Sequence, residues 1–171
     1  MKKSVLFIVT LFAFGLAASA QNFALIDMEY ILQRIPAYER ANTQLDQATQ
    51  KWYDEVEASA QEARNMYTQY QTDSPSLTEA QRTQREEAII AKEKQTAELR
   101  RKYFGQEGEI AKMQESLMRP IQDQVYTAVK EISEQNGYSM VVDRSSATSV
   151  IYASPLIDIS NEVLTKLGYS I

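Results

Sequence analysis

The 171-residue chain contains no cysteine and no histidine. Without Cys, the chain has no disulfide framework, no lipid-modified cysteine and no thiol nucleophile. Without Cys and His, ordinary zinc sites and His-based catalytic triads are excluded as well. No phosphate-binding glycine loop or EF-hand pattern is present either. We therefore expect no catalytic residues, no metal site and no cofactor.

Carboxylate chemistry is the enzymatic route that this composition leaves open. Asp27 and Asp143 could approach each other, as an acidic dyad, if the strands that end at them pair. Both lie at strand ends, where capping or turn hydrogen bonds are the commoner role of Asp. The sequence thus speaks against an enzyme.

Glycine and proline are scarce, with five and four residues, so a loop-rich fold is disfavoured and helix should dominate. The chain is also acidic, with 18 Lys and Arg against 23 Asp and Glu. Removal of Lys2 and Lys3 together with the rest of the first twenty residues would lower the formal charge from -5 to -7. Such a balance argues against nucleic-acid binding, which requires a basic surface to neutralise phosphates.

The first twenty residues have the pattern of a secretory signal peptide. Lys2 and Lys3 precede an apolar run from Val5 to Leu16, and Ala18-Ser19-Ala20 is a small-residue cleavage signal. The alternative, a permanent membrane anchor, is disfavoured because the run is shorter than the ~20 residues a span needs. We expect cleavage after Ala20 and export of the mature protein.

Two long helices follow, over Pro36 to Gln71 and Ser76 to Asn136. The first has apolar residues at three- and four-residue steps, the pattern of a coiled coil, with a four-residue insertion near Val56. Its expected seam, the row of side chains that faces the other helix, is Tyr38, Ala41, Leu45, Ala48, Trp52, Val56, Ala60, Ala63, Tyr67 and Tyr70.

Turn-forming residues at 71–76 predict a reversal of the chain. Either Ser76 with Glu79 or Thr78 with Gln81 could form the capping box of the returning helix. The expected returning stripe contains small and polar residues: Leu77, Ala80, Gln84, Ala88, Ala91, Gln95, Leu99 and Tyr103. Such a thin seam predicts a hairpin that bends more readily than a Leu-rich coil.

The returning helix should be interrupted at Gly105 and Gly108, bent at Pro120, and ended by Asn136-Gly137. The Gly-x-x-Gly spacing also occurs in an RNA-binding loop, but an acidic exported chain makes that use improbable. Short β-branched runs then predict strands at 140–142 and 149–152, which could pair with 23–26. A last helix, capped by Asp158, completes the chain.

Three strands of this length are too few for a stable core in a monomer, so the sequence predicts assembly. At this point the chain resembles the Skp/OmpH family of periplasmic chaperones. The residues that carry the resemblance are Ala24-Leu25-Ile26-Asp27-Met28-Glu29-Tyr30-Ile31-Leu32, Met140-Val141-Val142-Asp143 and Asp158-Ile159-Ser160-Asn161-Glu162-Val163-Leu164, in that order around the hairpin.

The resemblance implies an α+β fold: a long antiparallel helical hairpin on a small β-body, which is built from short terminal strands and completed by trimerisation. The expected domains are a signal peptide at 1–20, a β-body with flanking helices at 21–37 and 105–171, and the hairpin at 38–104 with its turn near 71–76. The expected trimerisation residues are Phe23, Leu25, Ile26, Val141, Val142, Val150 and Ile151.

The function implied by the resemblance is that of an ATP-independent holdase of the periplasm. It would bind unfolded outer-membrane proteins in a cavity between helical arms, with transient contacts to the membrane surface or insertion machinery. The best-known member is strongly basic, so the acidic charge here argues against electrostatic capture of anionic clients or lipopolysaccharide. An exported coiled-coil spacer or adhesin stalk is the alternative, but it would have a continuous Leu- and Ile-rich seam.

Apolar residues of the hairpin are the candidate client contacts: Tyr53, Met66, Tyr67, Tyr70, Ile89 and Ile90, together with Trp52. Adaptable Met and aromatic side chains suit contact with many partners. Trp52 and Tyr67 could instead belong to the seam. Tyr53, Met66 and Ile89 fall off the stripes traced above, so we expect these three to be exposed.

Overall fold

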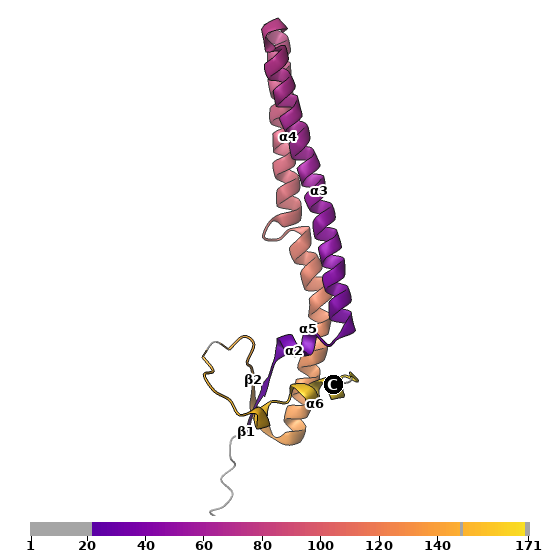
Figure 1. Ribbon diagram of the computed structural model, residues 1–171, viewed down its shortest axis with the longest axis vertical. Coiled ribbons are helices and arrows are strands. Elements are labelled where there is room, and N and C mark those ends of the chain that lie inside the picture. The colour runs from indigo at the N-terminus through magenta and orange to yellow at the C-terminus, as the bar shows by residue number, and fades with distance from the viewer. Residues whose placement is uncertain (1–21, 148, 170–171) are drawn as a thin grey trace, which may run out of the picture. The chain divides into compact units, whose positions relative to one another are not determined.

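The computed structural model describes residues 22–147 and 149–169 (Figure 1). The expected signal peptide, residues 1–20, lies outside the described residues. The chain divides into two compact units, a strand unit (22–31 and 125–169) and a hairpin unit (32–124). The hairpin unit therefore extends 20 residues beyond Phe104, where the sequence analysis placed the end of the hairpin.

Two long antiparallel helices form the hairpin. Helix α3 spans Pro36–Asp73, the 3-10 turn η1 spans Ser74–Ser76, and α4 returns over Glu79–Phe104. Figure 1 shows α4 lying beside the part of α3 that is nearest the turn. The predicted hairpin and its turn are thus confirmed. Of the two capping boxes that the sequence allowed, the structure has the one made by Thr78 with Gln81.

The seam of the hairpin is as thin as predicted on the α3 side. Val56 and Ala63 are buried there, and Ser59 lies buried between them. Its hydroxyl is 2.7 Å from that of Thr96, so a polar contact takes a place where a coiled coil would have an apolar pair. Tyr67, expected in this stripe, is instead half exposed.

The stripe expected on α4 is wrong by one residue at Ala88, Ala91 and Gln95, where Ile89, Lys92 and Thr96 are the covered side chains. Ala80, Ala88 and Ala91 are exposed, while Ile89 is buried and Lys92 is largely covered. The buried and half-buried side chains of α4 are Arg82, Ile89, Lys92, Thr96, Leu99 and Tyr103. Long charged side chains can cover apolar surface with their aliphatic stems. A hydrophobic pattern is traced through apolar residues alone, so it placed the alanines of α4 in the seam.

The returning helix is interrupted at Gly105 and Gly108, as predicted. Helix α4 ends at Phe104, Gly105 is its C-cap, and α5 spans Glu109–Asn136. A Cβ on Gly108 would lie 2.7 Å from the Tyr103 carbonyl oxygen, so no larger residue fits without a shift of the backbone. Pro120, by contrast, does not end the helix. Residues of α5 up to 124 belong to the hairpin unit and the others to the strand unit.

The strand unit holds a parallel two-stranded sheet, with β1 at Asn22–Ile26 and β2 at Tyr138–Asp143. The register pairs Ala24 with Val141 and Ile26 with Asp143. The unit also contains the start of α2 (Met28–Leu32), the short turn η2 (Pro155–Ile157) and α6 (Ser160–Lys166). Gly137 has φ 70° directly after α5, which confirms the predicted helix stop.

The core of the strand unit comes from β1, α2, the second half of α5 and α6. Its buried apolar residues are Ala24, Leu25, Ile26, Ile31, Val125, Ala128, Ile132, Ile159, Val163 and Leu164. On the side of β1 away from β2, the Leu25 carbonyl accepts a hydrogen bond from the Ile159 N–H at 2.9 Å. The segment before α6 therefore covers part of that strand edge.

The strand predicted at 149–152 is wrong. The described segment forms turns and extended coil, and Ile151 and Tyr152 are 101% and 83% exposed. A strand needs a partner for its backbone, and among the described residues this segment pairs with neither β1 nor β2. Across the described residues, no helix combines the length and the apolar character that a membrane span requires.

Candidate functional site

The hairpin exposes large apolar side chains that its own seam does not use. The exposed fractions of Tyr53, Tyr67 and Ile90 are 58%, 50% and 63%. They belong to both helices and to different heights along them, so they form dispersed contacts rather than one patch. This arrangement suits weak contact with many apolar sequences.

Two further candidates, Met66 and Tyr70, are half buried, so the expectation that Met66 is exposed is wrong. The Tyr70 hydroxyl donates a hydrogen bond to Glu86 on α4. That hydrogen bond is the main cause that raises the pKa of Tyr70, and partial burial of the ring adds to it. Tyr70 thus links the two helices through its polar end, and only part of its ring is open to a partner.

The expectation that Ile89 is exposed is wrong. Ile89 is 6% exposed, whereas its neighbour Ile90 is 63% exposed. Successive residues of a helix point about 100° apart, so the one-residue shift of the α4 stripe exchanges their environments. Ile89 holds the hairpin together, and Ile90 is the member of the pair that a client could touch.

Trp52 belongs to an aromatic cluster between the helices. Its ring stacks on Tyr103 with 5.2 Å between centroids and 9° between planes. The Tyr103 hydroxyl donates to Glu55 at 2.8 Å, which is the main cause that raises the pKa of Tyr103, and Lys102 lies 5.0 Å from the ring centroid. The cluster links the middle of α3 to the last turn of α4, so Trp52 packs in the seam.

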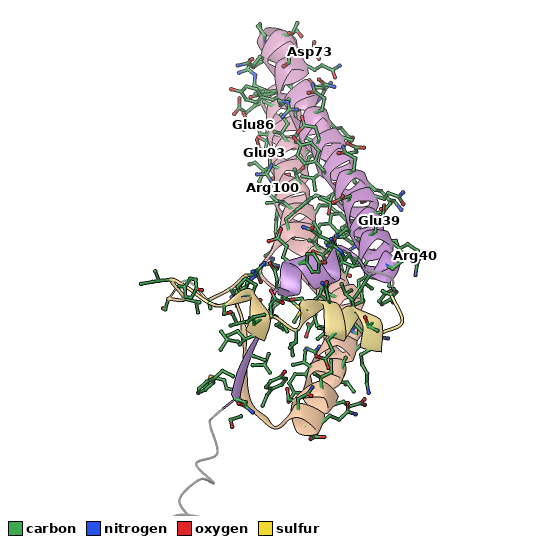
Figure 2. All side chains as sticks on the ribbon, turned by 60° about the horizontal axis from the view of Figure 1, so that its bottom comes forward. Glu39, Arg40, Asp73, Glu86, Glu93 and Arg100 are labelled. Atoms are coloured by element: carbon green, nitrogen blue, oxygen red, sulfur yellow. The ribbon has the colours of Figure 1, made fainter. Side chains whose placement is uncertain are left out.

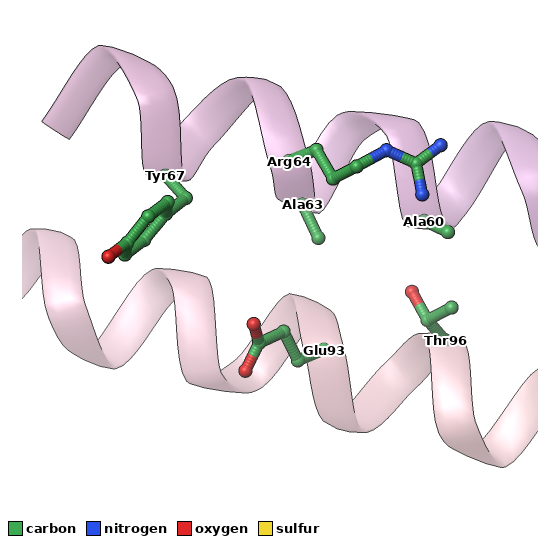
Figure 3. A pocket seen from close by; sticks show the side chains of 6 residues that line it. All are labelled: Ala60, Ala63, Arg64, Tyr67, Glu93 and Thr96. Carbon is green, nitrogen blue, oxygen red and sulfur yellow. The ribbon is translucent and has the colours of Figure 1, made fainter. Parts of the chain in front are cut away.

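An open cleft of about 280 Å³ lies between α3 and α4 near the middle of the hairpin. Figure 3 shows its lining, which consists of Ala60, Ala63, Arg64, Tyr67, Glu93 and Thr96. The small side chains of α3 leave this space open, and the Tyr67 ring closes one end of it. Of this lining, only Tyr67 was among the sequence candidates. The run Ala58-Ser59-Ala60 with Ala63 is the signal that could have indicated a cleft.

Exposed charged residues follow one another along α4. Figure 2 labels Glu86, Glu93 and Arg100, which succeed one another at seven-residue intervals and so share one face of α4. Ion pairs join the two helices, for example Lys92 with Glu62. The Lys92 side chain is only 17% exposed, so this pair also shields the seam from water.

The residues expected in trimerisation differ widely in exposure. Leu25 and Ile26 are buried in the core of the strand unit itself. Val141 and Val142 on β2 are half buried, while the exposed members are Phe23 at 46%, Val150 at 39% and Ile151 at 101%. Met140, Tyr152 and Leu156 add to the exposed apolar surface of the same unit.

Asp27 and Asp143 have structural hydrogen bonds. Asp27 accepts the Tyr30 N–H at 2.9 Å and pairs with Arg144 at 3.0 Å, and Asp143 accepts the Met28 N–H at 3.1 Å. Burial raises the pKa of Asp143, but hydrogen bonds from Ser145, the Met28 N–H and Ser146 outweigh it and hold that pKa below its ordinary value. Each carboxylate thus caps or bridges local backbone.

The comparisons with known proteins agree with one another. The family model described as "Outer membrane protein (OmpH-like)" matches residues 22–167. A "Chaperone protein Skp" of Yersinia enterocolitica is 27% identical over 159 residues, which is 90% of this chain and 92% of the relative. A solved chain from Caulobacter crescentus CB15, described as a candidate outer membrane chaperone (OmpH-like), superimposes with a TM-score of 0.69 at 12% identity. That match covers 88% of this chain and 86% of the other, and it shows a shared fold.

Proposed function

The chain belongs to the OmpH-like family of outer membrane proteins, and on that premise we propose that it is an ATP-independent holdase chaperone. It binds unfolded outer-membrane proteins and prevents their aggregation before membrane insertion. The observation that carries the proposal is the family match over residues 22–167, supported by the relative named Skp.

The surface of the hairpin supports this role physically. A holdase must cover apolar segments of many sequences without locking onto one of them. Tyr53, Tyr67 and Ile90 offer exposed apolar area at separate points along the two helices. Each buried apolar contact contributes only about 25 cal/mol per Å² of area, so many weak contacts can be made and released singly.

We further propose that three copies assemble through the strand unit. A two-stranded sheet is marginal by itself, and an open strand edge invites pairing with another chain. The unit also exposes the run Val150-Ile151-Tyr152 and Leu156, which a soluble monomer would leave in water. Burial of these residues between copies would supply the core that one chain lacks. Light scattering on the mature protein should give the mass of a trimer.

The proposed location is the periplasm, reached by the signal peptide with cleavage after Ala20. Delivery of clients would bring the assembly into transient contact with the membrane surface or the insertion machinery. Mass spectrometry of the protein purified from the periplasm tests this directly. A mature N-terminus at Gln21 is expected, and retention of residues 1–20 would contradict the proposed cleavage.

The central experiment dilutes a urea-unfolded β-barrel membrane protein into buffer with and without this protein, in the absence of ATP. We expect stoichiometric amounts of the trimer to suppress light scattering. A well-folded trimer without this effect would instead favour the spacer or stalk. The polar contact between Ser59 and Thr96 argues against that alternative, because a stalk gains from an unbroken apolar seam.

The client contacts are tested by replacing Tyr53, Met66 and Ile90 together with Ser. Retention of the unfolded client should weaken while the trimer mass stays unchanged. A matched control replaces three exposed alanines of α4 with Ser: Ala80, Ala88 and Ala91. If the control weakens retention as much as the test variant, the contacts lie elsewhere on the hairpin.

A further inference from the structure

The lining of the cleft includes two side chains of opposite charge, Arg64 and Glu93. They differ in whether another side chain neutralises that charge. Arg64 makes its hydrogen bonds on its own helix, through Nη2 and Nε. Its Nη2 donates to Glu57 Oε1 at 2.5 Å and to Gln61 Oε1 at 2.7 Å, and its Nε donates to Gln61 Oε1 at 3.1 Å. Figure 3 shows the Arg64 side chain running along α3 away from Tyr67. The positive charge in the cleft is therefore already neutralised.

Glu93 is in the opposite situation. Within the part of the chain that the structure describes, its carboxylate has no hydrogen bond or ion pair. The neighbouring Lys92 cannot serve it, because Lys92 pairs with Glu62. The cleft thus retains one uncompensated negative charge.

The aromatic end of the cleft lies beside this charge. In Figure 3 the Tyr67 ring reaches from α3 toward α4, and the Glu93 carboxylate is turned toward the same end. The ring is half exposed, so part of it is open to a partner. A carboxylate and an aromatic ring that line one cleft are groups that attract an ammonium or guanidinium group.

The remaining walls suit the aliphatic part of such a side chain. The methyl groups of Ala60 and Ala63 form the floor, and Ala63 is 7% exposed. Lys and Arg cover apolar surface with their stems while the charged head stays near water. A volume of about 280 Å³ fits one long side chain, and lies below the roughly 300–1,000 Å³ of small-molecule pockets.

We propose that this cleft binds a Lys or Arg side chain of the unfolded client, so that the hairpin prefers segments in which a cation stands beside apolar residues. The proposal rests on the proposed chaperone function and names a specificity within it. Charge complementarity supports this occupant: an acidic client residue would meet Glu93, which has no partner among the described residues, and an Arg64 that is already paired with Glu57.

The test uses the full mature protein and two fluorescein-labelled peptides of equal length and apolar content. One peptide carries Lys and the other carries Glu at the same positions. Fluorescence anisotropy should show tighter binding of the Lys peptide. Exposed ion pairs and cation–π contacts are individually weak, so Glu93→Gln should reduce affinity for the Lys peptide about threefold to fivefold. Its affinity for the Glu peptide should not fall.

Two further variants separate the cleft from general electrostatics. Tyr67→Leu keeps an apolar side chain but removes the ring, and should weaken binding of the Lys peptide about twofold to fivefold. Glu87→Gln is the matched control, because Glu87 is exposed on the same helix and does not line the cleft. It removes the same charge and should change affinity less than about twofold.

Equal affinity of the wild-type protein for both peptides would overturn the inference. So would unchanged binding by Glu93→Gln, or an equal loss in Glu87→Gln. The aggregation assay keeps this failure apart from failure of the chaperone proposal. If the unfolded β-barrel protein stays soluble while the peptides bind equally, only the cation preference is wrong. If that protein aggregates and neither peptide binds, both proposals fail.

Discussion

The neighbours Ile89 and Ile90 allow a prediction that separates the structural from the binding role of the hairpin. Ile89 is 6% exposed, and buried Ile→Ala replacements cost about 2–5 kcal/mol. The seam is thin and has water on both sides, so side chains can relax into the gap and the low end applies. We expect Ile89→Ala to lower the free energy of hairpin opening by about 2 kcal/mol.

Ile90→Ala is the matched variant, since it removes the same atoms one position along the chain. At 63% exposure it loses little packing, and the change in stability should stay within about 0.5 kcal/mol. Its effect should appear in client retention instead. The two variants should therefore differ in opposite ways: Ile89→Ala lowers the stability of the hairpin, whereas Ile90→Ala weakens client retention.

Native-state hydrogen exchange measures the opening directly, because amides of the hairpin report it without unfolding of the whole chain. In Ile89→Ala, the central amides of α3 and α4 should exchange about 30-fold faster, which corresponds to 2 kcal/mol. In Ile90→Ala they should exchange at nearly the wild-type rate. Equal acceleration in both variants, or a larger one in Ile90→Ala, would refute the seam assignment.

Three other changes test the remaining parts of the fold. Replacing Val141 and Val142 with Asp should dissociate the proposed trimer, since the charges would enter an assembled sheet unpaired, and an unchanged mass by light scattering would contradict this placement. The lowered pKa of Asp143 means that its stabilising contribution is present above about pH 4 and is lost as the pH falls through the folded-state pKa. Asp143→Asn, which keeps an oxygen for the Met28 N–H, should therefore destabilise the protein at pH 6 more than at pH 3 in urea titrations; equal effects would count against this assignment. Thr78→Ala removes the cap of α4 and should cost about 1 kcal/mol, seen as faster exchange of the first-turn amides, while unchanged exchange there would exclude a capping role.

The sequence predicts those features that depend on short-range signals. The hairpin, its turn, the break at Gly105 and Gly108 and the stop at Gly137 follow from turn formers and periodicity. The pairing of β1 with β2 could also be predicted, because 23–26 and 140–142 are short apolar runs on either side of the long helices.

The register of the seam was harder to predict from the sequence, for a physical reason. On α4 the side chains that cover the seam include Lys92 and Thr96, which a hydrophobic pattern ignores. Their burial depends on the partner helix, through the Lys92 ion pair to Glu62 and the Thr96 hydroxyl contact with Ser59. The sequence therefore misplaced Ile89.

The cleft shows a similar limit. Its space arises because small residues of α3 face Thr96 across the seam. Its charge arises because, among the described residues, Arg64 has hydrogen-bond partners and Glu93 has none. Neither fact belongs to a motif. The run 149–152 illustrates the converse, since its strand pattern is clear but the described chain provides no partner for it.

The parallel pairing of β1 with β2 sets the order in which the protein can fold. The two strands are separated by more than 110 residues, whereas the contacts of α3 with α4 connect segments joined by a short turn. Local contacts form before distant ones, and a chain becomes available from its N-terminus onward. The hairpin can therefore fold while β1 is still unpaired. Strand β1 remains unpaired and prone to aggregation until almost the whole chain has emerged. During that time this chaperone itself exposes the kind of segment that chaperones protect.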